Sequence, residues 1–305
     1  MELVFLGTGA GLPSKERNVT SVALKLLQQI NEVWLFDCGE ATQHQILKTS
    51  IKPRKITKIF ITHLHGDHIY GLPGLLSSRS FQDGTSPLTI YGPKGIKNYV
   101  ETSLAISETH LNYQLNIIEF TEGTIISDDN FTVECRLLKH GINSYGFRII
   151  EADRIGELLV DELKADGIHP GPIYKEIKDN ERTTLEDGRV IKRSDYIGPT
   201  KKGKCICIFG DTIYDHQHIH FAREADVLVH EATFASDDKD LAKNYNHTTT
   251  TEAATLAKEA HVKTLVLTHI SSRYQRSDYE QLLHEAKTVF SNTYLANDLK
   301  VIPII

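Results

Sequence analysis

The most constraining feature of the chain is the segment Thr62-His63-Leu64-His65-Gly66-Asp67-His68, which follows the apolar run Ile59-Phe60-Ile61. Three imidazoles and a carboxylate this close together are costly to bury unless they are paired or bound to metal. Histidine nitrogen and carboxylate oxygen suit a zinc-like divalent ion, and Gly66 lets the backbone turn so that ligands on both sides converge. The segment therefore predicts a metal site. A solvated histidine-rich loop is the alternative.

Length and composition indicate a globular chain. It has 305 residues, 40% of them hydrophobic, which is enough for a sizeable core. No stretch approaches the roughly 20 apolar residues that span a bilayer, and the N-terminus lacks a basic signal-like segment. We therefore expect a cytoplasmic protein without a membrane contact. The net charge of -6 disfavours non-specific coating of nucleic acid, although it does not exclude a local basic patch.

The four cysteines have no CxxC spacing, so we expect reduced core residues and not zinc ligands or disulfides. Two of them alternate in Lys204-Cys205-Ile206-Cys207-Ile208, which places both on one face of an expected strand.

Short apolar runs alternate with helical segments along most of the chain, which predicts an α/β architecture. The clearest helix is 249–260, capped by Thr248 or Thr249 with Glu252 near the third helical position. Other helices are expected within 40–48 and 71–80. The expected strands are 3–6, 22–27, 33–36, 58–62, 88–91, 131–138, 145–149, 205–209, 226–229 and 264–267.

Residues of about 151–202 interrupt this rhythm. Between Pro172 and Lys204 there are nine Lys or Arg against six Asp or Glu, together with several turn signals such as Gly171-Pro172 and Asp187-Gly188. This composition predicts a protruding arm or hairpin insertion. A simple surface connection remains the alternative.

Three further polar residues, His140, Asp211 and His269, occupy the same context as the first cluster, directly after a strand. One ion would take His63, His65 and His140. A second would take Asp67, His68 and His269, with Asp211 between the two. Seven ligands exceed what one tetrahedral ion accepts, so the sequence predicts two ions.

These residues resemble a known family. Thr62–His68 is similar to the HxHxDH motif of the metallo-β-lactamase superfamily. Pro13-Ser14-Lys15-Glu16-Arg17-Asn18 resembles the PxKxRN element of ribonuclease Z, the tRNA 3'-processing endonuclease. His230-Glu231-Ala232-Thr233 matches its HEAT motif, and His247-Thr248-Thr249 matches its HST loop with threonine in place of serine. Together the matches run from Phe5 to Tyr274 and point to the short bacterial form.

The resemblance implies a fold and an assembly. The fold would be a single domain over 1–305, a four-layer αβ/βα metallo-β-lactamase sandwich, with 151–202 as an inserted flexible arm that grips tRNA. It would hold two Zn²⁺ per subunit, with Mn²⁺ or another divalent ion as the alternative. The enzyme would be a homodimer. Lys175 and Lys178 are the candidate tRNA contacts in the arm, beside Lys192 and Arg193.

The resemblance also implies a reaction. The enzyme would cut the 3' trailer from tRNA precursors and leave a 3'-hydroxyl on the tRNA and a 5'-phosphate on the trailer. Asp67 is the candidate proton acceptor and His247 the candidate acid, oriented by Glu231. Without the family match, His247 would be read as a surface histidine near a helix start. Candidate substrate contacts outside the arm are Lys15, Arg17, Asn18 and Arg273.

Two other functions remain open. The chain could be another dinuclear hydrolase of the same superfamily, acting on small phosphodiesters, for which the arm would be dispensable. It could also be a metal-stabilised RNA-binding protein without catalysis. A second histidine-rich stretch, His216-Gln217-His218-Ile219-His220, is expected to form a solvated helical surface and not an additional metal site.

Overall fold

The computed structural model describes residues 1–304 and divides into two compact units. The larger unit joins Met1–Ile150 to the chain from Lys204 onwards, and the smaller unit is Glu151–Gly203. Within residues 1–304 no helix combines the length and the apolar character needed to cross a bilayer.

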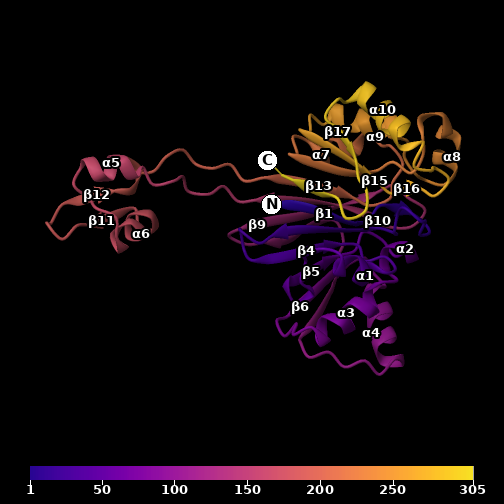
Figure 1. Ribbon diagram of the computed structural model, residues 1–305, viewed down its shortest axis with the longest axis horizontal. Helices are drawn as coiled ribbons and strands as arrows, with labels where there is room; N and C mark the ends of the chain where they lie inside the picture. The colour runs from indigo at the N-terminus through magenta and orange to yellow at the C-terminus, as the bar shows by residue number, and fades with distance from the viewer. Residues whose placement is uncertain (305) are drawn as a thin grey trace. The chain divides into compact units, whose positions relative to one another are not determined.

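The larger unit is built around two seven-stranded sheets (Figure 1). The first has the strand order β18-β1-β3-β4-β5-β6-β7. Its strands are β1 (Glu2–Gly7), β3 (Ser21–Leu26), β4 (Glu32–Phe36), β5 (Ile56–Phe60), β6 (Leu88–Gly92), β7 (Leu115–Glu119) and β18 (Val301–Pro303). The pairs β4–β5, β5–β6 and β6–β7 are parallel.

The second sheet has the order β17-β15-β14-β13-β10-β9-β8. Its strands are β8 (Gly123–Ser127), β9 (Phe131–Leu138), β10 (Ser144–Glu151), β13 (Cys205–Phe209), β14 (Val227–Glu231), β15 (Thr264–Thr268) and β17 (Thr293–Leu295). The neighbours β13, β14, β15 and β17 run parallel, so their carboxyl ends meet at one edge.

Three buried apolar clusters show that the unit has four layers. One cluster joins the facing sides of the two sheets, where Phe60 stacks on Phe36 and also contacts Phe147 of the opposite sheet. The other two lie between each sheet and its own helices. Residues alternate along the strands accordingly: Ile206 and Ile208 face the opposite sheet, whereas buried Cys207 faces the helices.

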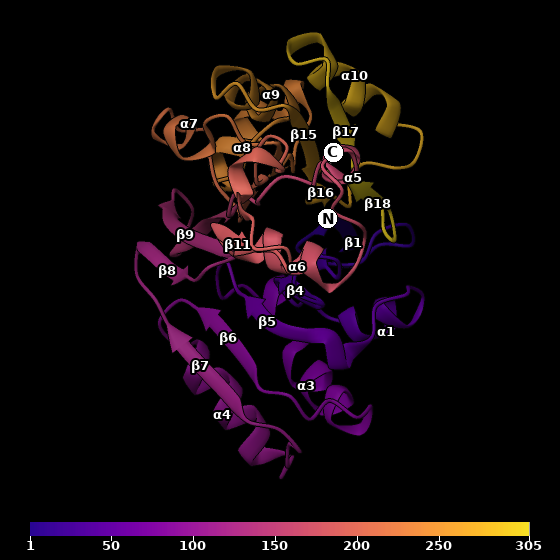
Figure 2. The ribbon, with the colours of Figure 1, turned by 90° about the vertical axis from the view of Figure 1, so that its left-hand side faces the viewer.

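The helices cover the outer face of each sheet (Figure 2). Those against the first sheet are α1 (Thr42–Leu47), α3 (Leu72–Phe81) and α4 (Ile96–Ile106), and those packed into the apolar cluster of the second sheet are α7 (Gln217–Ala222), α9 (Thr250–Glu259) and α10 (Tyr279–Val289). Two further short helices, α2 (Gly66–Ile69) and α8 (Lys239–Asn244), lie within loops. As expected, α9 begins with a capping box in which Thr249 and Glu252 bond each other's backbone amides.

The loops after strands of both sheets meet at one edge of the larger unit, near α2 and the short pair β2 (Gly9–Ala10) and β16 (Ile270–Ser271) (Figure 1). The loops after β5, β9, β13, β14 and β15 all contribute polar side chains there. The polar residues that follow strands in both halves of the chain therefore lie at this edge.

The smaller unit has its own core. It contains α5 (Val160–Ala165), α6 (Pro172–Asp179) and the hairpin of β11 (Arg182–Thr184) and β12 (Val190–Lys192). Leu163, Ile168, Ile177 and Ile191 pack together inside it. The two chain segments that enter and leave it pair with each other at Arg154–Lys201 and Leu158–Ile197.

Candidate metal centre

The structure brings all seven predicted ligands to the edge where the strand-end loops meet. Within residues 1–304, the seven predicted ligands fall into two groups. In each group the ligand atoms lie within 4.8 Å of one another. They are His63, His65, His140 and Asp211, and Asp67, His68 and His269. The six other residues divide as the sequence predicted, and Asp211, which was expected between the two groups, also forms a group with His247 and His269.

In the first group three imidazole nitrogens converge. His65 Nδ1 lies 3.0 Å from His63 Nε2 and 3.3 Å from His140 Nε2. The other ring nitrogen of His140 donates to the carbonyl oxygen of Asn246 at 2.8 Å, which leaves Nε2 as the nitrogen with a lone pair. Three nitrogens this close suit a shared cation better than a chain of hydrogen bonds.

Asp211 links the two groups. Its Oδ2 lies 3.6 Å from His63 Nε2, 3.5 Å from His68 Nε2 and 3.3 Å from His269 Nε2. The carboxylate is buried, and the surrounding histidines hold its pKa well below the ordinary value although burial alone would raise it. One ionised oxygen facing histidines of both groups is the arrangement expected of a bridging ligand.

His68 provides a direct test of whether a metal fits. Its Nε2 is buried and has no hydrogen-bond partner, and it points toward Oδ2 of Asp67 at 3.4 Å. Its Nδ1 lies 2.8 Å from Asp37 Oδ2, so the carboxylate of Asp37 fixes the ring. A buried nitrogen without a partner costs free energy, which a cation at this position would recover. The residues present therefore fit a divalent metal ion.

Two supporting residues were not predicted as part of the site. Asp37 follows β4, contacts His68, and also accepts hydrogen bonds from the amide and hydroxyl of Thr62 at 2.8 Å. Thr233 Oγ1 lies 2.8 Å from His269 Nδ1. The signal for Asp37 was present, since it comes directly after an apolar strand as the predicted ligands do.

The protonation states are set by burial and by neighbouring charge. Burial, with the nearby His68 adding to it, holds the pKa of His63 well below the ordinary value, and burial and His140 lower that of His65. Burial opposes the charge of His68, but Asp211, Asp37 and Asp67 outweigh it and raise its pKa well above the ordinary value. His63 and His65 are therefore neutral, which is the form that binds metal, whereas His68 would release a proton on binding one.

Glu231 and His247 form a pair beside the predicted ligands. Oε1 of Glu231 lies 2.8 Å from Nδ1 of His247, and Oε2 accepts a hydrogen bond from Thr233 Oγ1 at 2.6 Å. Burial alone would lower the pKa of His247, but the charge and hydrogen bond of Glu231 raise it to about 9. The ring lies 5.1 Å from that of His140 and 5.3 Å from that of His269, between centroids. Glu231 thus favours the protonated form of His247, which lies beside the predicted ligands.

The loop that carries the PxKxRN-like element touches the centre through its backbone. The amide of Gly11 donates to Asp67 Oδ2 at 2.8 Å, and Gly9 pairs with Ile270, directly after His269. Lys15 is exposed in this loop. Asn18 is half-buried, and its side-chain amide donates to the carbonyl oxygen of Glu40.

Arg17 differs from the expectation. It is only 3% exposed, and its guanidinium donates to Thr8 Oγ1 and to the carbonyl oxygen of Ala296, both at 2.6 Å. It also lies over the ring of Tyr279, 4.2 Å from the centroid. A guanidinium occupied in this way has no donors directed at RNA, so Arg17 fixes the loop that presents Lys15. Sequence spacing alone does not reveal this burial.

The other predicted substrate contacts are accessible. Arg273 is exposed and lies 5.3 Å from the ring centroid of Phe234. Lys175 and Lys178 are exposed on α6, on the side away from buried Ile177.

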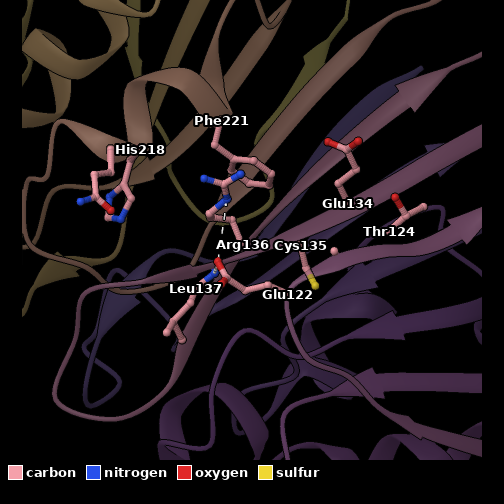
Figure 3. Close-up of a pocket in the computed structure, with 10 residues that line it drawn as sticks. Glu122, Thr124, Glu134, Cys135, Arg136, Leu137, His218 and Phe221 are labelled. Atoms are coloured by element: carbon pink, nitrogen blue, oxygen red, sulfur yellow. Dashed lines mark hydrogen bonds and ion pairs between the residues drawn. The ribbon is translucent and has the colours of Figure 1, made fainter.

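A cleft elsewhere on the larger unit is separate from this centre. It has a volume of about 660 Å³ and lies between β8–β9 and α7, where Arg136 sits beside Glu122 and Phe221 (Figure 3). None of the seven predicted ligands lines it. His218 does, and it is buried, whereas His216 and His220 are exposed. The expectation of a solvated surface thus holds for two of these three histidines and is wrong for His218.

Comparison with known proteins gives the family. The chain is 61% identical over 306 residues to "Ribonuclease Z" of Oceanobacillus iheyensis, with 100% of both chains covered. It is 57% identical over 305 residues to "Ribonuclease Z" of Bacillus cereus strain G9842, covering 100% of this chain and 99% of that protein. Residues 1–155 match the family model described as "Anti-Pycsar protein Apyc1", to which this N-terminal half therefore also belongs.

Solved structures give the fold. The short form of human tRNase Z superposes with a TM-score of 0.72 at 32% identity over 100% of both chains. A metallo-beta-lactamase fold protein from Bacillus subtilis has a TM-score of 0.68 at 19% identity, covering 99% of this chain and 98% of that one, and supports the fold alone. The chain has the metallo-β-lactamase fold, and its full-length identity to these curated relatives places it in the ribonuclease Z family.

Proposed function

We propose that the protein is a metal-dependent endoribonuclease that removes the 3' trailer from tRNA precursors in the cytoplasm. The observation that carries the proposal is the convergence of seven histidine and aspartate ligand atoms beside the Glu231–His247 pair. Full-length relatives named ribonuclease Z, and a solved human tRNase Z, support tRNA as the substrate.

The ligand set supports two ions, with zinc as the first candidate because the donors are nitrogen and carboxylate oxygen. His63, His65 and His140 would hold one ion and Asp67, His68 and His269 the other, with Asp211 between them. When bound, two such ions lower the pKa of a water nucleophile and neutralise charge on the phosphate.

The protein's own groups then handle the protons. Asp67, whose carboxylate faces His68 and His269, accepts the proton of the attacking water. His247 donates a proton to the leaving 3'-oxygen of the tRNA, which leaves a 3'-hydroxyl there and a 5'-phosphate on the trailer. Glu231 keeps His247 protonated and oriented through the 2.8 Å contact to Nδ1.

The substrate contacts divide between the two units. Lys15, Asn18 and Arg273 contact the RNA near the cut. Lys175 and Lys178 in the inserted arm, residues 151–202, contact tRNA phosphates, since exposed cations gain from counterion release. We also propose a homodimer, to be checked by light scattering at concentrations used for activity.

The Asp67→Ala variant tests the assignment. It removes a ligand and the proposed base together, so cleavage should fall by several orders of magnitude while tRNA binding is retained. Elemental analysis should find two metal ions per wild-type chain and fewer in the variant. His216→Ala, an exposed histidine outside the centre, serves as the matched control. Undiminished turnover by Asp67→Ala would refute the mechanism.

The second candidate is a hydrolase of the same fold that acts on small phosphodiesters. The cluster of seven ligand atoms is the observation that keeps it open, because the cluster alone does not fix the size of the phosphodiester. It requires turnover of a small phosphodiester at least as efficient as that of a tRNA precursor, measured as kcat/KM for both.

A further inference from the structure

Two tyrosines beside the metal centre expose most of their side chains. Tyr70 is 65% exposed and follows His68 by two residues, and Tyr245 is 62% exposed and precedes His247 by two. Single exposed apolar residues are ordinary, but a pair of aromatic rings at a reactive centre marks a binding surface.

The ring of Tyr70 rests on the metal-binding motif. A side chain at Gly66 would place its Cβ only 2.2 Å from Cε2 of Tyr70, so the ring lies directly against the bare backbone between His65 and Asp67. The lack of a side chain at Gly66 thus sets the position of the ring. Its remaining surface is available to a ligand.

The ring of Tyr245, two residues before the proposed acid in the chain, is linked to it through an aromatic neighbour. It stacks on Phe234 with centroids 6.3 Å apart and planes inclined by 19°. Phe234 is buried and its centroid lies 6.2 Å from that of His247. This row fixes Tyr245 relative to His247.

We propose that Tyr245 and Tyr70 are stacking platforms for the two bases that flank the scissile phosphate. Tyr245 takes the last base of the tRNA, because Phe234 links it to the histidine that protonates the 3'-oxygen of that nucleotide. Tyr70 takes the first base of the trailer, on the side of Asp67. The assignment rests on the proposed function, since it needs an RNA cut at this centre.

Stacking suits this position because the nucleotides at the cut are unpaired and every base presents a π-face. An aromatic platform therefore orients the phosphate without demanding a particular sequence. A protein partner on the same tyrosines would cover the metal centre and block the substrate, which favours RNA as the occupant.

Matched abasic substrates test the proposal. Three tRNA precursors are compared: one intact, one lacking the last tRNA base, and one lacking the first trailer base. With the intact precursor, Tyr245→Ala and Tyr70→Ala should each lower kcat/KM by about 10-fold, the order of one lost stacking contact. Tyr→Phe at either position should retain the activity, because the ring and not the hydroxyl is needed. Phe81→Ala, which removes a ring that is 86% exposed on α3, should change nothing.

The abasic substrates should then make each defect selective. Tyr245→Ala should add no further loss when the last tRNA base is missing, and Tyr70→Ala none when the first trailer base is missing. Equal loss on all three precursors would overturn the assignment. The assignment would also be overturned if an alanine variant changed its mass in light scattering while its kcat/KM stayed the same. The tyrosines would then form a contact between copies of the chain.

Failure of the proposed function would be visible separately. Wild-type protein that does not cut the intact precursor would refute that function, whatever the tyrosines do. Binding of the three RNAs in the presence of chelator provides the second readout, with the same selective pattern expected for the tyrosine variants. Identical binding by wild type and both alanine variants would overturn the stacking proposal without any cleavage data.

Discussion

At the scale of single residues, the centre depends on contacts that fix imidazole rings. Asp37 holds His68, the carbonyl oxygen of Asn246 holds His140, and Thr233 holds His269. Each leaves the other ring nitrogen directed at the centre. These partners set which nitrogen carries the lone pair, and metal affinity depends on that choice.

The proposed acid gives the first residue-scale prediction. His247→Ala should lower the single-turnover cleavage rate by about 10²- to 10⁴-fold, since a positioned acid contributes that much. The Kd of the variant for the precursor, measured in the presence of chelator, should stay within a few-fold of the wild-type value. The defect should shrink for a precursor with sulfur in place of the leaving 3'-oxygen, because a thiolate departs without protonation. An equal defect on both substrates would contradict the role of His247 as acid.

Glu231→Gln separates positioning from acid catalysis. The amide keeps the shape of the side chain but removes the charge that raises the pKa of His247 to about 9. The alkaline limb of the pH–rate profile should therefore move to lower pH, because His247 loses its proton earlier. An unmoved limb would show that Glu231 acts on stability alone.

His218 makes stability depend on pH. Burial lowers its pKa to about 4, from an ordinary value of 6.5, so between these values the unfolded chain binds a proton that the folded chain does not. The free energy of unfolding should fall by roughly 3 kcal/mol as the pH drops through this window. His218→Gln should flatten that slope in urea titrations, whereas exposed His220→Gln should not. Equal slopes for both variants would refute the assignment.

At the scale of elements, buried strands were predictable and edge elements were not. The apolar runs before His63, Asp211 and His269 correspond to β5, β13 and β15. The strands β7 and β8 at the sheet edges, and the helices α4 and α10, were not predicted. Half-exposed edge strands carry no continuous apolar run, so a pattern of buried residues does not reveal them.

In the site, too, residues marked by their local sequence could be predicted, whereas residues defined by contacts distant in the chain could not. The seven predicted ligands could be named because each follows a strand, and strand ends collect at one edge. Thr233 and buried Arg17 could not be assigned in this way, because their contacts depend on residues far away in the chain. Arg17, for example, bonds Ala296.

The cap of α9 gives a prediction at this scale. Thr249→Ala removes the side chain that accepts from the amide of Glu252, which should lower the free energy of unfolding by about 0.5–2 kcal/mol. Urea unfolding monitored by far-UV circular dichroism measures it. Thr255→Ala, inside the same helix, should cost less because its hydroxyl bonds only a carbonyl oxygen already used by the helix. A larger loss for Thr255→Ala would contradict the capping argument.

At the scale of the whole molecule, the inserted unit should be separable from catalysis. Ile150 and Cys205 are paired across β10 and β13, so a short turn between Glu151 and Gly203 can replace the insertion without moving either strand. We expect the shortened protein to fold and to keep two metal ions. Its kcat/KM should fall steeply for tRNA precursors but remain unchanged for a small phosphodiester. Unchanged processing of precursors would contradict the role of Lys175 and Lys178.

The central claim is that this chain cuts tRNA precursors at a metal centre. Its most direct test is incubation of the purified protein with an end-labelled precursor carrying a 3' trailer, with and without chelator. The account predicts one metal-dependent cut directly after the discriminator base, the unpaired base that follows the acceptor stem, leaving a 3'-hydroxyl on the tRNA. Absence of that cut with metal supplied, or its persistence after complete chelation, would contradict the account.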